Sequence, residues 1–268
     1  MKTALVIVDT YPDPGIARHA LMQCLNRFRA DECMVFSDQD LLPGTRWIPI
    51  EPIRTIRDYE AVVLDRLAQE TRCDLHLIVQ WDGFVLDGQR WDADFAGYDY
   101  VGAPWPHLGN LVGNGGFSLR SRKLLRAVRK LRRTRTEGEP AEDLQICVTL
   151  RPRLEAMGVR FPDAGVAGRF AVETPGPNGR IESFGFHGAF NFPLVMSERD
   201  ILEHMPGILM RMGKAPNMWF LFILNALVRG QLTVARALAR DLQAHRAPLW
   251  EALGPALQQR GVPAGLLR

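Results

Sequence analysis

The feature that most constrains the fold is an alternation, in the first half of the chain, of short apolar runs with segments of helical periodicity. Residues 3–8 and 75–80 are predominantly apolar runs, which are typical of strands buried on both faces of a sheet. A shorter run predicts another strand over residues 33–36, and helical spacing predicts helices over 15–29 and 56–69. Because alternating strands and helices build parallel layers, the sequence predicts an α/β fold with a mainly parallel sheet.

The remainder of the chain divides into an irregular stretch and a helical one. From residue 90 to about residue 121, aromatic residues, prolines and glycines are closely spaced, and long loops of this kind usually carry function. Further helices are expected over residues 121–133, 142–154, 217–229, 231–244 and 247–260. We therefore expect an α/β domain over residues 1–195 and a C-terminal helical region over residues 196–268.

Composition excludes several classes of protein. The net charge of +3 over 268 residues is too small to argue for nucleic acid on electrostatics alone. The four cysteines form no C-x-x-C pair and no zinc-type spacing, so we expect reduced, mostly buried thiols in a cytoplasmic protein. The apolar run at the N-terminus is too short for a signal peptide, and the run over residues 218–228 is too short to span a bilayer.

A basic segment over residues 120–135 has several interpretations. Its cations are Arg120, Arg122, Lys123, Arg126, Arg129, Lys130, Arg132, Arg133 and Arg135. They are spread around most of a helix, which favours a solvated helix over a binding stripe. An anionic acceptor, an acidic membrane surface and RNA stay open as alternatives. Aromatic residues do not interleave with the charges as single-strand binders require, which counts against a nucleic-acid partner.

Three sets of polar residues could carry chemistry. Asp82 follows the strand over residues 75–80 and could ligate a divalent cation, or simply cap a turn. Glu142 and Asp143 begin a helix, where one of them could act as a general base, or both could complement the helix dipole. His187 lies between glycines and aromatic residues, where it could ligate a metal or be a hydrogen-bonded core histidine.

The glycine-rich turn in LVGNGGFSLRSRKLL, residues 111–125, runs directly into the basic helix. Glycines before a helix suggest a phosphate-binding loop. However, the stretch lacks the G-x-x-x-x-G-K-[ST] spacing, and it does not follow the first strand as a dinucleotide fingerprint would. We expect instead that its glycines permit close backbone approach to a bound ligand.

Taken in order, QWDGF, YDYVGAPW, VGNGGFSLRSRK, ED and FGFHG resemble an uncharacterised bacterial family, domain of unknown function 5672. This family is related to the metal-dependent A-type glycosyltransferases, and the resemblance covers about residues 1–195. It implies an A-type glycosyltransferase-like fold, in which a Rossmann-like mixed sheet is flanked by helices and followed by a C-terminal helical appendage. It also implies binding of a nucleotide-sugar through Mn²⁺ or Mg²⁺.

The resemblance also implies roles for individual residues. The metal ligands would be Asp82 and His187, and Gln80 replaces the first aspartate of the family's Asp-x-Asp motif. The catalytic base would come from the acidic pair Asp143 and Glu142. Donor-binding residues would be Asp9, Thr10, Tyr11, Asp38, Gln80 and Trp81. Residues at the sugar or acceptor would be Trp105, Asn114, Gly115, Gly116, Phe117 and Arg120. The rings of Trp81, Trp105 and Phe117 would offer apolar faces, and each could equally belong to the core.

The function expected on these grounds is metal-assisted, inverting transfer of a sugar from a nucleotide-sugar to a saccharide or lipid-linked acceptor. The alternative is a non-catalytic module that binds a glycan or a nucleotide-sugar on the same scaffold, which the glutamine at position 80 permits. We expect a cytoplasmic protein, and attachment at the inner face of the membrane stays open. The C-terminal helices could pack on the catalytic domain, contact a membrane peripherally, or form a homo-oligomer.

Overall fold

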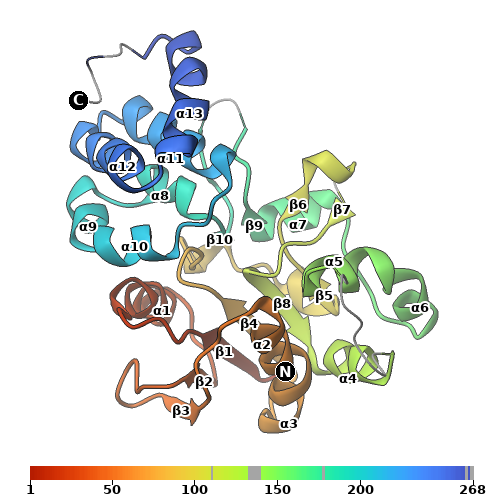
Figure 1. Cartoon of the computed structure of the whole chain (residues 1–268). Helices are drawn as coiled ribbons and strands as arrows, with labels where there is room; N and C mark the ends of the chain where they lie inside the picture. The colour runs from red at the N-terminus through yellow and green to blue at the C-terminus, as the bar shows by residue number, and fades with distance from the viewer. Residues whose placement is uncertain (110, 132–139, 177–178, 263–264, 266–268) are drawn as a thin grey trace. The chain divides into compact units, whose positions relative to one another are not determined.

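The sheet is the element from which the rest of the fold is built. The structure is a computed structural model and describes residues 1–109, 111–131, 140–176, 179–262 and 265. Among these residues the largest sheet has six strands in the order β3-β2-β1-β4-β8-β5 (Figure 1). The strands are β1 (Thr3–Val8), β2 (Glu32–Ser37), β3 (Arg46–Pro49), β4 (Leu75–Val79), β5 (Tyr100–Val101) and β8 (Phe117–Ser121).

Strand direction confirms the predicted α/β class and adds one reversal. β1 pairs in parallel with β2 and with β4, and β2 pairs in parallel with β3. β8 is antiparallel to both of its neighbours, β4 and β5. The sheet is therefore mixed and mostly parallel. The prediction that the glycine-rich turn runs directly into a helix is wrong, because the buried strand β8 lies between the turn and the helix.

Helices cover the sheet because its central strands are apolar on both faces. All six residues of β1 are buried, and side chains alternate between the two faces of a strand. Ala4, Val6 and Val8 belong to a core cluster that also contains Val63 and Leu124. The helices around the sheet are α1 (Gly15–Arg27), the continuous segment α2 (Ile56–Glu60), η1 (Ala61–Arg66) and α3 (Leu67–Glu70), and α4 (Arg122–Leu131). These match the helices expected over residues 15–29, 56–69 and 121–133.

Helix α4 corrects the expectation that positive charge surrounds the basic helix. Leu124, Leu125 and Val128 are fully buried, so one face of α4 is apolar and packs into the core. Arg126, Arg129 and Lys130 are exposed on the remaining surface. This division is the ordinary amphipathic pattern of a helix that lies on a sheet. Arg132, Arg133 and Arg135 lie outside the described residues.

The remaining elements up to residue 187 are short. The expected helix over residues 142–154 is present as α5 (Glu142–Leu144), η5 (Gln145–Thr149) and α6 (Arg151–Ala156). The other elements are η2 (Gly88–Arg90), η3 (Ala93–Gly97), β6 (Pro104–Trp105), η4 (Pro106–Leu108), β7 (Leu111–Val112), α7 (Ala164–Phe170), β9 (Ala171–Val172) and β10 (Gly185–Phe186). β9 and β10 form a parallel pair, so the residues that follow them, Glu173 and His187, emerge side by side.

By contacts within the chain, the structure divides into two compact units. The first contains residues 1–174 and 182–187, and the second contains residues 175–181 and 188–268. This division falls slightly before the expected boundary after residue 195. The second unit is helical, with η6 (Ala189–Asn191), α8 (Phe192–Val195), α9 (Glu198–Glu203), α10 (Met205–Arg211), α11 (Pro216–Val228), α12 (Leu232–His245) and α13 (Ala247–Gln259).

The core of the second unit forms around α11, where Trp219, Phe222 and Ile223 are fully buried. The guanidinium of Arg246 lies 4.9 Å from the centre of the Trp219 ring, a cation–π distance. Among the described residues, none of the helices combines the length and the apolar character that crossing a bilayer requires.

A buried histidine in the sheet makes a prediction about acid stability. His76 on β4 is fully buried, and its Nδ1 donates to the Arg120 carbonyl at 3.0 Å while its Nε2 lies 2.9 Å from Thr71 Oγ1. Burial lowers the pKa of His76 from 6.5 to about 4, against the raising effect of the hydrogen bond to Arg120.

Between those two pH values His76 is therefore protonated in the unfolded chain and neutral in the native protein. We expect the free energy of unfolding to fall by about 3 kcal/mol from this histidine as the pH drops from about 6.5 to about 4, with no further loss below that. Urea unfolding across this range should show a shallower decline in H76Q than in the wild type. Equal slopes in the two proteins would contradict the assignment.

Candidate functional site

Strand direction brings three separate segments to one edge of the sheet. β1 and β4 are parallel with Ile7 opposite Val79, so the residues that follow them leave the sheet at the same edge. β8 runs the other way and begins with Phe117 opposite Val79. The loop before β8, residues 113–116, therefore lies at that edge as well. In sheets of this kind ligands bind beyond the carboxyl ends of the parallel strands.

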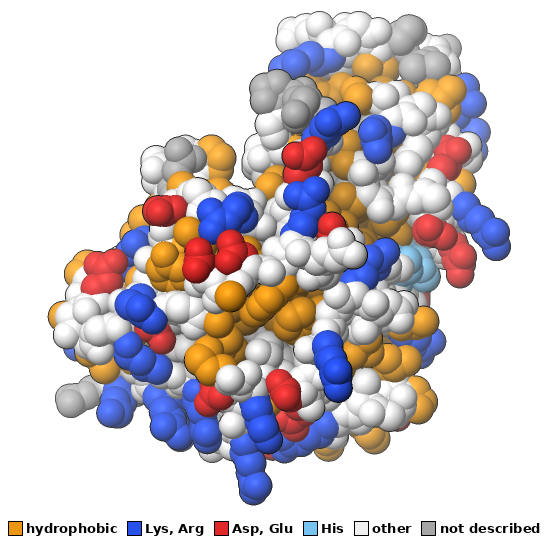
Figure 2. Space-filling view, turned by 180° about the vertical axis from the view of Figure 1, so that it is seen from behind, with side chains coloured by type: hydrophobic (Ala, Val, Ile, Leu, Met, Phe, Trp, Pro, Cys, Tyr) orange, Lys and Arg blue, Asp and Glu red, His pale blue; other side chains and the backbone are white. Residues whose placement is uncertain are grey.

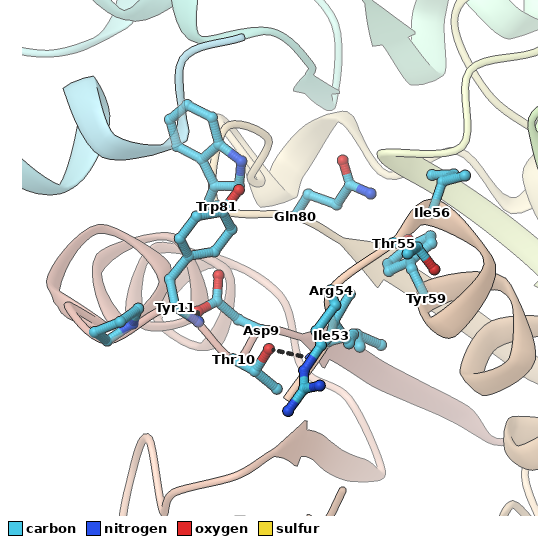
Figure 3. A pocket seen from close by; sticks show the side chains of 12 residues that line it. Asp9, Thr10, Tyr11, Ile53, Arg54, Thr55, Ile56, Tyr59, Gln80 and Trp81 are labelled. Carbon is cyan, nitrogen blue, oxygen red and sulfur yellow. Dashed lines mark hydrogen bonds between the residues drawn. The ribbon is translucent and has the colours of Figure 1, made fainter. Parts of the chain in front are cut away.

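A cavity of about 490 Å³ lies at this edge. It is lined by Val8, Asp9, Thr10, Tyr11, Pro12, Ile53, Arg54, Thr55, Ile56, Tyr59, Gln80 and Trp81. Figure 3 shows Tyr11 and Trp81 together on one side and Ile56 and Tyr59 on the other, with Gln80 extending between them. The hydroxyl of Thr10 accepts a hydrogen bond from the Ile53 amide at 2.8 Å, which joins the two loops of the cavity.

Five of the six expected donor-binding residues line this cavity: Asp9, Thr10, Tyr11, Gln80 and Trp81. Asp38 does not line it. Its side chain is exposed and lies 3.4 Å from the hydroxyl of the neighbouring Ser37, so the structure does not bring Asp38 to the other expected donor-binding residues.

The wall built by Arg54, Thr55, Ile56 and Tyr59 was not anticipated from the sequence. One local signal for it exists. Thr55 and Asp58 form a capping box, in which the side chain of each accepts from the backbone amide of the other. The T-x-x-D pattern places the start of α2, and hence these residues, just after the strand β3.

His187 lies between two carboxylates beside the cavity. Its Nε2 is 3.3 Å from Asp82 Oδ1 and 3.3 Å from Gln80 Oε1, and its Nδ1 is 3.4 Å from Glu173 Oε1. The side chains of Asp82 and His187 are only 10% and 14% exposed. Asp82 and His187, the two expected metal ligands, are thus in direct contact although they are far apart in the sequence. Glu173 was missed, because no local pattern marks it.

The charges of this cluster depend on one another. Burial by itself would lower the pKa of His187, but Asp82 and then Glu173 raise it to about 10. Burial likewise acts to raise the pKa of Glu173, but the hydrogen bond and the charge of His187 lower it below the usual value. The two carboxylates therefore favour the protonated form of His187.

Two adjacent residues of the loop before β8 connect His187 to Asp143. The Asn114 side-chain nitrogen lies 2.9 Å from His187 Nδ1, and the Gly115 amide donates to Asp143 Oδ2 at 3.0 Å. Asn114 adopts φ +62°, and its Oδ1 accepts from the Gly116 amide at 3.2 Å, a local bond that supports this left-handed turn. One short loop therefore positions both the histidine and the carboxylate.

The two glycines of this loop are required by the side chains that approach them. A Cβ atom on Gly115 would lie 2.2 Å from Glu142 Oε1, and one on Gly116 would lie 2.0 Å from His187 Nε2 and 2.7 Å from Gln80 Oε1. Such distances are far inside van der Waals contact. The expectation that these glycines permit close approach is consistent with this geometry, but the approaching groups seen here are protein side chains.

Arg120 and Glu142 form a buried ion pair, which corrects the roles expected for both. Arg120 is fully buried, Glu142 is 3% exposed, and the Arg120 NH2 nitrogen lies 2.8 Å from Glu142 Oε1. Burial opposes the charge of Arg120, but Glu142 raises its pKa well above the usual range. A carboxylate held in this way is a poor proton acceptor, and a guanidinium so enclosed does not reach a sugar. Of the acidic pair, only Asp143 is partly exposed.

Two aromatic residues expected to stack on a sugar are part of the core. Trp105 is 6% exposed, and its ring covers Gly113, where a Cβ atom would lie 2.2 Å from the ring. Phe117 is fully buried, with its ring centre 5.3 Å from that of Phe170. Neither ring offers a face to a ligand, so these two predictions are wrong. Trp81 is partly exposed at the cavity.

The side chains of Asp82, Glu173 and His187 can be compared with the ligands that divalent cations take in proteins. Within the described ranges, no group of three or more His, Cys, Asp or Glu side chains is arranged to hold a metal. However, Mg²⁺ commonly takes only one or two protein ligands and completes its shell with substrate phosphates and water. Asp82 supplies one carboxylate and His187 an imidazole nitrogen, and Glu173 beside Nδ1 is the carboxylate that typically orients a metal-binding imidazole. The residues therefore fit a cation that is shared with a phosphorylated ligand.

The fold and the site define an α/β protein with a ligand cavity and a carboxylate–histidine cluster at the carboxyl edge of its sheet. The chain belongs to the family described as a protein of unknown function, DUF5672, whose model matches residues 45–187. This confirms the family resemblance drawn from the five motifs. No curated protein matches the sequence.

Solved structures similar to the chain include three transferases. The mannosyltransferase PcManGT from Pyrobaculum calidifontis, in complex with GDP-Man and Mn²⁺, is 15% identical, with a TM-score of 0.44 and coverage of 99% of this chain and 81% of that chain. A glycosyltransferase involved in the glycosylation of the major capsid of PBCV-1 is 13% identical, with a TM-score of 0.48 and coverage of 77% and 100%.

The third is the galactosyltransferase LgtC in complex with donor and acceptor sugar analogs, which is 13% identical, with a TM-score of 0.38 and coverage of 69% and 86%. At this level of identity and overlap, these likenesses do not establish an activity for this chain.

The close approach at Gly116 makes a prediction. In G116A the new methyl group would displace His187 or Gln80, and we expect a loss of about 1–3 kcal/mol in the free energy of unfolding. The imidazole NMR signals of His187 should shift at the same time. G168A is the matched control, because no atom lies within 4 Å of a Cβ at that helical position. Unchanged His187 signals in G116A would contradict the packing described here.

Proposed function

We propose that the protein is a metal-assisted glycosyltransferase, which moves a sugar from a nucleotide-sugar to a hydroxyl group of a saccharide or lipid-linked acceptor with inversion. The observation that carries this proposal is the loop of Asn114 and Gly115, which contacts His187 with one residue and Asp143 with the next. A cation site and a general base are thereby held together, next to a cavity at the ligand edge of the sheet.

The cavity supports the proposed donor class. Tyr11 and Trp81 offer aromatic surface to a nucleobase on one side of the cavity, and Asp9 and Thr10 offer polar atoms at the end of β1. Gln80 links the two parts of the site, because it lines the cavity and also lies 3.3 Å from His187 Nε2. A nucleoside diphosphate that enters the cavity would extend toward Asp82 and His187.

Asp82 and His187 would hold Mn²⁺ or Mg²⁺, and Glu173 would orient the imidazole of His187. The cation, when bound, offsets the negative charge that develops on the departing nucleoside diphosphate. To accept a cation, His187 must release its proton, and the same two carboxylates that raise its pKa also attract the cation that replaces the proton.

Asp143 is the proposed general base. Its Oδ2 accepts from the Gly115 amide at 3.0 Å and its Oδ1 from the Leu144 amide at 2.8 Å, so the carboxylate is held in one orientation. The acceptor oxygen forms a bond to the anomeric carbon as the bond from that carbon to the donor phosphate oxygen breaks. The hydroxyl proton passes to the Asp143 carboxylate during this attack.

A second candidate is a non-catalytic module that binds a nucleotide-sugar or a glycan. The observation that favours it is Gln80, a neutral amide at the position where the related motif carries its first aspartate. Both candidates use the same cavity, so binding alone does not separate them. Donor binding without release of nucleoside diphosphate, under any acceptor, would favour the module. A cytoplasmic location remains part of the proposal for either candidate.

Donor binding gives the first test. A nucleotide-sugar that binds only the native protein, present at about 100 times its dissociation constant, stabilises it by about 2.7 kcal/mol. We expect a thermal-shift screen of nucleotide-sugars to show such a shift in the presence of Mn²⁺. D82N should lose the Mn²⁺-dependent part of the shift, whereas D38N, at an exposed aspartate outside the cavity, should keep it. Equal Mn²⁺-dependent shifts in D82N and the wild type would refute the cation site.

Catalysis gives the second test. Because D143N keeps the size of the side chain and removes its basicity, we expect kcat for sugar transfer to fall about 10²- to 10⁴-fold, with donor affinity unchanged. Transfer and donor hydrolysis can be followed by the release of nucleoside diphosphate, and donor affinity by calorimetry. E142Q serves as the comparison, because Glu142 is committed to Arg120 and its loss should chiefly lower stability. A rate unchanged in D143N would exclude this aspartate as the base.

A further inference from the structure

A second cavity lies at the other end of the sheet. Its volume is about 450 Å³, and its lining includes Asp74 and Leu75 at the start of β4 and Ser121 at the end of β8. Since β4 and β8 are antiparallel with Leu75 opposite Ser121, these residues mark the edge opposite to the one where Gln80 and Gly116 lie. None of the donor-cavity residues lines this cavity.

Four cations line this second cavity: Arg122, Lys123, Arg126 and Arg160. Lys123 is already paired, because its Nζ lies 3.2 Å from Asp99 Oδ2 and also contacts the Gly158 carbonyl. In the described part of the chain, no carboxylate lies within ion-pair distance of Arg122, Arg126 or Arg160. Three arginines therefore line one cavity without a carboxylate of the described residues at ion-pair distance.

The two acids at this cavity already have hydrogen-bond partners. Asp99 accepts from the hydroxyl of Ser121 at 2.6 Å and from the Arg160 amide at 2.8 Å, in addition to Lys123. Asp74 Oδ2 accepts from the backbone amide of Lys2 at 2.9 Å. Against the four cations, these two carboxylates leave an excess of two positive charges among the lining side chains.

An orphaned donor adds an independent observation. The Nε of Arg122 is buried from solvent, and it has no hydrogen-bond partner among the described residues. A buried N–H group without a partner costs free energy, and this one belongs to a side chain that lines the cavity. The first turn of α4 is not the source of this site, because the amides of Arg122 and Leu124 already donate to the Asp74 carbonyl and to Ser121 Oγ.

We propose that this cavity is a second binding site, for a phosphoryl anion. Guanidinium groups match phosphate oxygens with paired hydrogen bonds, and an excess of two positive charges suits a dianion better than a single carboxylate. The anion comes either from a soluble phosphorylated compound or from the headgroup of an anionic lipid. Figure 2 shows Lys and Arg side chains gathered along the lower edge of the face turned away in Figure 1.

The chain offers a charge-matched pair of variants for a test. R126Q/R160Q removes two exposed cations that line the cavity, so it should fold normally. R129Q/K130Q removes two exposed cations of the same helix that do not line it. The soluble probe is pyrophosphate, and acetate at equal ionic strength is its comparison anion. The membrane probe is a vesicle of phosphatidylglycerol, and a vesicle of phosphatidylcholine is its comparison. EDTA is present throughout, so that no divalent cation occupies the donor site.

We expect pyrophosphate, phosphatidylglycerol vesicles or both to bind, and the probe that binds identifies the source of the anion. The affinity should fall about tenfold or more in R126Q/R160Q and stay unchanged in R129Q/K130Q. For pyrophosphate, backbone amide NMR shifts should move at residues 97–99 and 121–123 and not at residues 9–11 and 80–82. Absence of binding to every probe, equal weakening in the two variants, or equal binding of acetate would overturn the proposal.

Discussion

The buried ion pair of Arg120 and Glu142 is the interaction on which the candidate site depends. Two charges removed from water are stable only when their partners are close and well placed, and here the two groups meet at 2.8 Å with almost no exposure. Arg120 also donates to the Gly115 carbonyl at 3.3 Å and to Ser118 Oγ at 3.0 Å. One guanidinium thereby ties β8, the loop before it and the start of α5 together.

The arrangement of the reactive groups follows from that tie. Glu142 is drawn inward to Arg120, so its neighbour Asp143 is left at the surface of the site, where the Gly115 amide holds it. The same loop turns through Asn114 to reach His187. Loss of the ion pair would leave an uncompensated buried charge and would also release the loop, so stability and geometry are coupled at this point.

Local sequence patterns predicted the parts of the fold that depend on local chemistry. The apolar runs at β1 and β4 identified the ligand edge, and with it five of the twelve residues that line the cavity, because parallel strands end at a common edge. β8 escaped prediction because a charged residue, Arg120, lies within it and glycines precede it. The burial of Trp105, the pairing of Arg120 with Glu142 and the place of Glu173 depend on tertiary contacts, for which the local pattern holds no signal.

The reversal of β8 also separates the two cavities. Gly116 lies just before this strand and Arg122 just after it, so the five residues of β8 stand between the donor edge and the basic cavity. At about 3.4 Å per residue, such a strand spans about 17 Å. A ligand in one cavity therefore does not contact a ligand in the other. Both β4 and β8 run between the two cavities, and β8 resists displacement because the partners of its buried Arg120 would be lost.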